Sequence, residues 1–204
     1  MHATDILQGE HRVIEQVLTC LEKLAHQCVE DKTLDATAAR QALDFFQTFA
    51  DQCHHAKEED HLFPLLEARG FPPFHGPTEV MRYEHDLGRQ YLRAMRSVVD
   101  RAAAGDPDAL ALFADQARAN VALLREHIAK EDQRLFPMAN DRLTEQDQEE
   151  LLDAFARVES QHQDAGTHEK FLQIAGALAE RFGVRPHSAE SVVSRGCCSC
   201  GHHG

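Results

Sequence analysis

The sequence contains the pattern His-x-x-x-Glu twice, and the same three residues follow each copy. His54 and Glu58 precede Leu-Phe-Pro at 62–64, and His127 and Glu131 precede Leu-Phe-Pro at 135–137, 73 residues further on. On an α-helix, residues four apart lie on one face, with Cβ atoms about 5–6 Å apart. A histidine and a glutamate at this spacing can reach one metal ion together. The chain must therefore place two such helices around a shared centre.

A second pattern repeats upstream of each copy. Glu10-His11 reappears as Glu84-His85, 74 residues later. The sequence therefore predicts a duplicated helical hairpin that carries metal ligands on all four helices. Four-helix bundles build such sites in their cores from inward-facing side chains. Imidazole and carboxylate ligands together suit iron, zinc or manganese.

The candidate metal ligands share repeat-matched positions on the predicted helices. They are His11, His54, Glu58, His85, His127 and Glu131. A carboxylate buried without a partner is costly, and a metal ion removes that cost. We expect two metals, one held by His11 and His54 and the other by His85 and His127, with both glutamates bridging them.

These residues resemble the haemerythrin-like family of HHE cation-binding domains over roughly residues 5–140. The resemblance rests on the four histidines and on the two His-x-x-x-Glu segments with their Leu-Phe-Pro continuation. It implies an antiparallel four-helix bundle around two non-haem iron ions, joined by an oxo or hydroxo bridge when oxidised. It also implies that this centre meets O2, peroxide or NO.

The sequence departs from the oxygen carriers of that family. The carriers place His-x-x-x-His on the third helix and His-x-x-x-x-Asp on the fourth, whereas here the second position on the third helix is Arg89. The missing histidine puts reversible oxygen storage in doubt. Glu15 is the repeat equivalent of Arg89. It either ligates a metal, pairs with Arg89 beside the centre, or belongs with Arg89 to the surface.

Four acidic residues lie next to the candidate ligands. Glu10 and Glu84 precede histidines, and each either accepts the second imidazole N–H or is an ordinary surface charge. Glu59 and Asp132 follow the ligand glutamates, and we expect them to be solvated.

Three further residues lie near the candidate ligands in the sequence. His61 lies seven residues after His54, on the same face of an α-helix, and is a candidate fifth ligand or proton donor. Tyr83 is a further candidate for a site role. His55 directly follows His54, and we expect it to be peripheral.

The fold is expected to be all-α. We predict an antiparallel up-down four-helix bundle at residues 1–140, a C-terminal extension of two helices at 141–183, and a flexible Cys/His-rich tail at 184–204. The extension either covers one end of the bundle or mediates a homodimer. The bundle helices are expected near 5–29, 35–69, 78–104 and 107–140, with Pro64 and Pro137 kinking or ending their helices.

The tail concentrates potential soft-metal ligands. They are Cys197, Cys198, Cys200, His202 and His203. Such tracts suit metal acquisition, a redox relay or thiol sensing. The alternative is a chain end without a selected function.

Composition excludes some classes of function. The net charge of −13 argues against nucleic acid, no apolar run approaches the ~20 residues of a membrane span, and the N-terminus lacks a secretory pattern. We expect a cytoplasmic di-iron protein that binds or reacts with O2, NO or peroxide in sensing, scavenging or detoxification. The alternatives are a di-iron peroxidase, an NO-stress iron-centre repair protein, or an iron storage or sensing module. A redox partner is left open.

Overall fold

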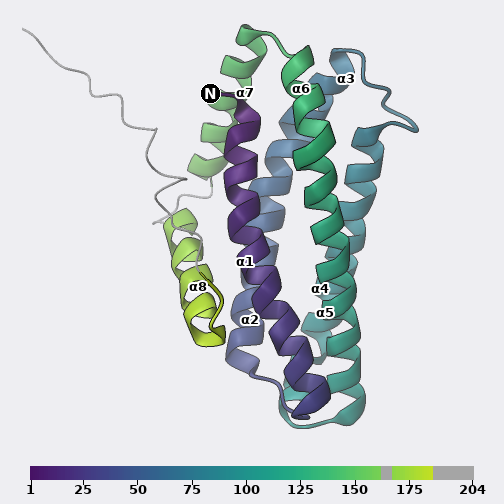
Figure 1. Ribbon diagram of the computed structural model, residues 1–204, viewed down its shortest axis with the longest axis vertical. Coiled ribbons are helices and arrows are strands. Elements are labelled where there is room, and N and C mark those ends of the chain that lie inside the picture. Colours follow the sequence, from purple (N-terminus) through teal and green to yellow (C-terminus); the bar gives the residue numbers. More distant parts are fainter. Residues whose placement is uncertain (162–166, 186–204) are drawn as a thin grey trace, which may run out of the picture.

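The computed structural model describes residues 1–161 and 167–185, which are helical almost throughout and contain no strand. Four long helical segments run antiparallel, up and down, and form the predicted bundle (Figure 1). The first and third segments are α1 (Ala3–Glu30) and α4 (Pro77–Ala103). The second comprises α2 (Ala36–Phe45), the π-helical η1 (Phe46–His55) and η2 (Glu58–Leu62), and α3 (Phe63–Ala68). The fourth comprises α5 (Pro107–Lys130), the π-helical η3 (Glu131–Leu135) and α6 (Phe136–Arg142). This confirms the all-α prediction.

Local sequence signals explain where the helices begin and end. The side chain of Asp35 accepts a hydrogen bond from the backbone N–H of Ala38 at the start of α2. Asp106 does the same for the start of α5, where Pro107 occupies the first turn. Gly105 lies in the connection between α4 and α5 and has a φ of +85°, a conformation that residues with a side chain rarely adopt.

Of the two outcomes expected at the repeated prolines, a kink or a helix end, the helix end does not occur. Pro64 and Pro137 lie in the first turns of α3 and α6, directly after η2 and η3. In both copies the preceding turn is π-helical, and the N–H of the residue before the proline bonds to the carbonyl of the ligand glutamate five residues back. Such wide turns are often found at functional sites.

Two further helices pack outside the bundle. α7 (Glu145–Gln161) and α8 (Thr167–Phe182) lie on the side formed by α1 and the second segment (Figure 1). Phe155 of α7 is fully buried, as is Leu178 of α8. The extension thus covers one side of the bundle, and its separation from 1–140 as a domain stays a prediction.

The apolar core is divided into two clusters. The larger lies toward the α4–α5 connection and includes Leu21 and Phe45, and the smaller lies at the opposite end and includes Leu7, Phe63 and Phe136. Along each bundle segment the candidate histidine lies where one cluster gives way to the other. The fold therefore holds a polar layer between two apolar ones.

Two further expectations concern a membrane span and the Cys/His-rich tail. None of its helices is both long and apolar enough to cross a membrane. The five Cys and His residues of the predicted tail metal or redox group lie outside the described residues.

Candidate metal centre

The four repeat-matched histidines meet in the centre of the bundle as two pairs. The Nε2 atoms of His11 and His54 are 3.1 Å apart, and those of His85 and His127 are 3.0 Å apart. All four side chains are buried. The pairs are those that the sequence predicted, one from each half of the duplication.

Two buried glutamates link the pairs. The Oε1 and Oε2 atoms of Glu58 lie 3.6 Å from His54 Nε2 and 3.5 Å from His85 Nε2, so this carboxylate spans both pairs. Oε2 of Glu131 lies 3.2 Å from the Nε2 atoms of both His11 and His127. Neither carboxylate has a hydrogen bond of good geometry, although both are fully buried.

Every one of the four histidines turns its other ring nitrogen toward an acidic side chain. The Nδ1-to-carboxylate distances are 2.7 Å for His11–Asp132, 2.9 Å for His54–Glu10, 2.6 Å for His85–Glu59 and 2.9 Å for His127–Glu84. A carboxylate accepts the Nδ1–H, which leaves the Nε2 lone pair directed at the centre. The short Nε2–Nε2 contacts then bring lone pairs together, and a cation between them removes the repulsion. The donor set therefore fits metal ions.

These contacts contradict the expectation for Glu59 and Asp132, and they decide between the two alternatives left open for Glu10 and Glu84. Glu59 and Asp132 were expected in solvent, but they hold His85 and His11. Glu10 and Glu84 accept from imidazoles, so they are not ordinary surface charges. The helical projection misplaced Glu59 and Asp132 because it assumed 3.6 residues per turn through segments that are π-helical.

His55 belongs to the site, contrary to the expectation that it is peripheral. Its ring stacks on that of His85, with centroids 3.7 Å apart and planes 12° apart. Its Nδ1 atom lies 3.5 Å from Oδ1 of Asp51. The repeat equivalent is Ile128, on the α-helical α5, whereas His55 ends η1. The wider π-helical turn changes the angle between successive residues, which lets His54 and His55 both face inward; the His-His doublet was the available signal.

Ligand atoms gather into two groups that share one residue. Within each group all atoms lie within 4.8 Å of one another; the groups are His11, His54, Glu58 and Glu131, and His55, Glu58, His85 and His127. His61 and Tyr83 belong to neither, and Tyr83 is largely exposed. His61 lies within η2, and the π-helical residues between it and His54 break the seven-residue match.

Glu15 and Arg89 do not pair with each other, which removes one of the three roles left open for them. Glu15 accepts from Arg12 at 2.7 Å and joins neither ligand group. Arg89 instead donates to Asp51 at 2.7 Å and to Glu59 at 2.7 Å.

The two repeats reverse the charges at these positions. Arg12 and Glu15 correspond to Asp86 and Arg89, and each arginine also bonds the acidic partner on its own helix. Arg12 reaches Asp132, as Arg89 reaches Glu59. In each half of the duplication, one arginine therefore bonds the carboxylate that holds the first histidine of that half.

Burial and neighbouring charges shift the pKa values of these acids in opposite directions. Burial, and then the charge of Glu131, raise the pKa of Glu58 well above its ordinary value. Burial also acts to raise the pKa of Glu131, but His127 and His11 outweigh it and lower the pKa well below its ordinary value. In Glu10, Lys57 and His54 outweigh burial and lower the pKa to about 2. The pKa values of the two linking glutamates are therefore shifted in opposite directions.

The repeated Leu-Phe-Pro has a packing role at the centre. Phe136 stacks on His11, with centroids 5.5 Å apart, and Phe63 stacks on His85 at 6.0 Å. Both phenylalanines are fully buried in the smaller apolar cluster. They separate the histidines from solvent at that end of the bundle.

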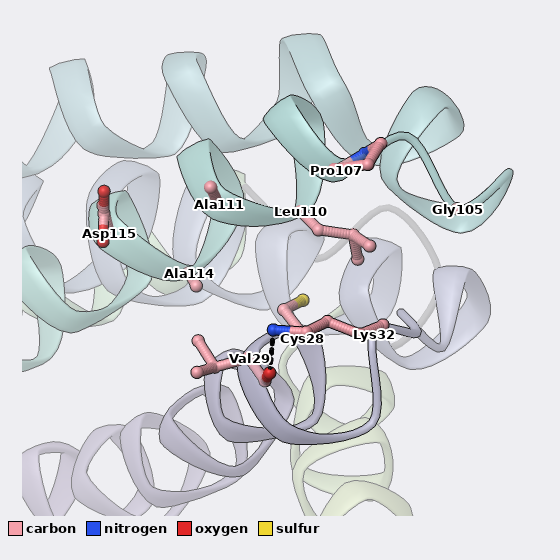
Figure 2. A pocket seen from close by; sticks show the side chains of 9 residues that line it. All are labelled: Cys28, Val29, Lys32, Gly105, Pro107, Leu110, Ala111, Ala114 and Asp115. Carbon is pink, nitrogen blue, oxygen red and sulfur yellow. Dashed lines mark hydrogen bonds between the residues drawn. The ribbon is translucent and has the colours of Figure 1, made fainter.

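A pocket of about 490 Å³ lies away from this centre, between the end of α1 and the start of α5. Figure 2 shows Lys32 bonding to the carbonyl of Val29 at its edge, with Cys28 and Leu110 on opposite walls. Cys28 lies 17 residues after His11 on α1, or about 25 Å along the helix. The pocket is therefore separate from the metal centre.

Comparison with known proteins identifies the family of this chain. Uncharacterized proteins of Mycobacterium bovis and Mycobacterium tuberculosis are 27% identical over 139 residues, covering 68% of this chain and 54% of each relative. The chain thus spans about half the length of these relatives. No solved structure matches it. The family model of the hemerythrin HHE cation binding domain matches residues 2–139, and the chain therefore belongs to the hemerythrin family of HHE cation-binding domains.

Proposed function

We propose that this protein holds two iron ions in the His/Glu centre and binds or reacts there with O2, NO or peroxide. One observation carries the proposal: buried Nε2 lone pairs converge on two buried carboxylates, Glu58 and Glu131, that have no other partner. Membership in a family of cation-binding domains supports the presence of a bound cation. Iron is the proposed cation because imidazole and carboxylate ligands together suit it.

The ligands are assigned by the two groups of converging atoms. One iron would take His11 and His54, and the other His55, His85 and His127. Glu58 and Glu131, each close to a histidine of both pairs, would serve both irons. The set of ligands expected from the sequence is thereby extended by His55 alone. Bound iron would supply one-electron redox chemistry and coordination positions open to a small ligand.

The surrounding residues prepare these ligands. The four carboxylates at Nδ1 fix the orientation and tautomer of each imidazole and raise its basicity. Arg12 and Arg89 in turn hold two of those carboxylates. Phe63 and Phe136 keep water from one side. We infer a role in sensing, scavenging or detoxification in the cytoplasm; steady turnover of peroxide with a reductant would favour the peroxidase alternative.

The test is anaerobic reconstitution with iron, followed by metal analysis and absorption spectra before and after O2 and peroxide. We expect two iron ions per chain and near-ultraviolet bands that appear on oxidation. Less than one iron per chain after reconstitution would contradict the proposal. His55→Phe should lower the iron content or change the spectrum, whereas the matched control His61→Phe should leave both unchanged.

A further inference from the structure

A small cavity adjoins the His55 and His85 side of the metal centre, between η1, α4 and α5. Its walls include His55, His85, Gly88, Arg89 and Asn120. The cavity has a volume of about 10 Å³, close to the minimum that holds a single water-sized molecule. That size restricts an occupant to a molecule of very few heavy atoms.

Asn120 brings an unpartnered amide to this cavity. Its side chain is fully buried, and neither Oδ1 nor Nδ2 has a hydrogen-bond partner. It lies seven residues before His127, on the same face of α5. An unpaired buried amide destabilises a protein, so its presence beside a metal centre points to a ligand that would pair with it.

A groove lies next to the cavity. The groove has a volume of about 300 Å³ and is also lined by Arg93 and Arg96. It shares Asp51, Arg89 and Leu92 with the cavity. Arg89 is held across this shared wall by its hydrogen bond to Asp51. A small molecule would therefore pass the Arg89–Asp51 pair to reach His85.

We propose that the cavity is the binding site for hydrogen peroxide, that Asn120 pairs with it, and that the Arg89 groove is its route from solvent. This rests on the proposed function. The choice of peroxide follows from the amide, which offers both donor and acceptor atoms. Hydrogen peroxide has both O–H donors and oxygen acceptors, whereas O2 and NO have no donor.

Two variants test the cavity from different sides. In Gly88→Ala, the added Cβ would lie 3.6 Å from Oδ1 of Asn120, an ordinary contact, so the methyl group would take up cavity space without strain. The matched control is Gly176→Ala on α8, where an added Cβ meets nothing within 4 Å. Asn120→Leu keeps the size of the side chain and removes its hydrogen-bonding atoms.

The measurements are iron content, the azide dissociation constant of the oxidised protein, and the rate constant of its reaction with peroxide. We expect Gly88→Ala and Asn120→Leu to keep their iron, to bind azide about tenfold more weakly and to react with peroxide about tenfold more slowly. For Asn120→Leu this is the order of one lost hydrogen bond, and for Gly88→Ala the loss comes from the space that the methyl group occupies. Gly176→Ala should match the wild type. Metal-free Asn120→Leu should melt at a higher temperature than the wild type, because it loses an unpaired amide.

The two proposals fail in different ways. If both variants keep iron, bind azide and react with peroxide like the wild type, the cavity proposal is wrong and the proposed function stands. If the wild type loads iron but forms no adduct with azide or NO and consumes no peroxide, the proposed function is wrong.

Discussion

Lys57 and Lys130 occupy equivalent positions in the two repeats, yet Lys57 is fully buried and Lys130 keeps 37% of its side chain exposed. Both bind the carboxylate that holds a histidine, Glu10 for Lys57 and Glu84 for Lys130. Lys57 also donates to Glu159 of α7 at 2.7 Å. The extension covers the first of these lysines and leaves the second at the surface, so the two halves of the centre differ in their surroundings.

Replacing the two lysines should therefore have unequal effects on stability. Lys57→Met leaves Glu10 buried without its cation, and we expect it to lower the free energy of unfolding by about 3–5 kcal/mol. Lys130→Met removes a partly exposed pair and should cost about 0–1 kcal/mol. Chemical denaturation of the metal-free proteins measures both values. Equal losses would show that α7 does not bury the first lysine in solution.

The carboxylates at Nδ1 should influence metal affinity without touching the metal. Asp132→Asn removes the charged acceptor of His11, and we expect iron affinity to fall about 10–100-fold. Competition with a chelator measures the affinity. The control is Asp115→Asn, which changes an exposed carboxylate on the same helix and should have no effect. An unchanged affinity in the first variant would contradict the role assigned to Asp132.

The phenylalanine beside His11 should be a large contributor to stability. Phe136→Ala opens a cavity in the smaller apolar cluster, and a loss of about 3–5 kcal/mol in the free energy of unfolding is expected. Phe74→Ala, at an exposed position, should change it by no more than about 0.5 kcal/mol. Thermal or urea unfolding of the two variants provides the comparison, and similar values would argue against the packing described.

The Arg69–Asp147 ion pair should make the free energy of unfolding depend on pH. Hydrogen bonds from Arg69 and then from the backbone N–H of Thr144 hold the pKa of Asp147 well below its ordinary value. A lowered folded-state pKa gives stability that is present above the unfolded value of about 3.9 and is lost as pH falls toward the folded value. Asp147→Asn should lower the melting temperature at neutral pH, and its difference from the wild type should shrink below about pH 4. A difference that persists at low pH would contradict this assignment.

Repeat matching predicted the parts of the site that depend on α-helical spacing. The convergence of His54 with Glu58, and of His127 with Glu131, follows from residues four apart on one face. The helix starts expected near residues 35 and 107 also agree with the structure, in which Asp35 and Asp106 cap the helices.

The π-helical segments explain most of what sequence reasoning missed. Their i-to-i+5 bonding is selected by the packing around the centre, so no propensity signals it in the sequence. His55, Glu59 and Asp132 all lie at or next to such segments. The exchanged charges at Arg12 and Arg89 were missed for another reason, because their partners come from different segments of the bundle.

Each group of ligands takes members from both halves of the duplication. His11 and His54 need Glu131, and His85 and His127 need Glu58, with Asp132 and Glu59 supporting the opposite halves. The N-terminal hairpin therefore cannot complete either group while the ribosome is still synthesising the rest of the chain. Metal capture is postponed until the fourth helix has emerged, and the bound ions then oppose any separation of the two hairpins.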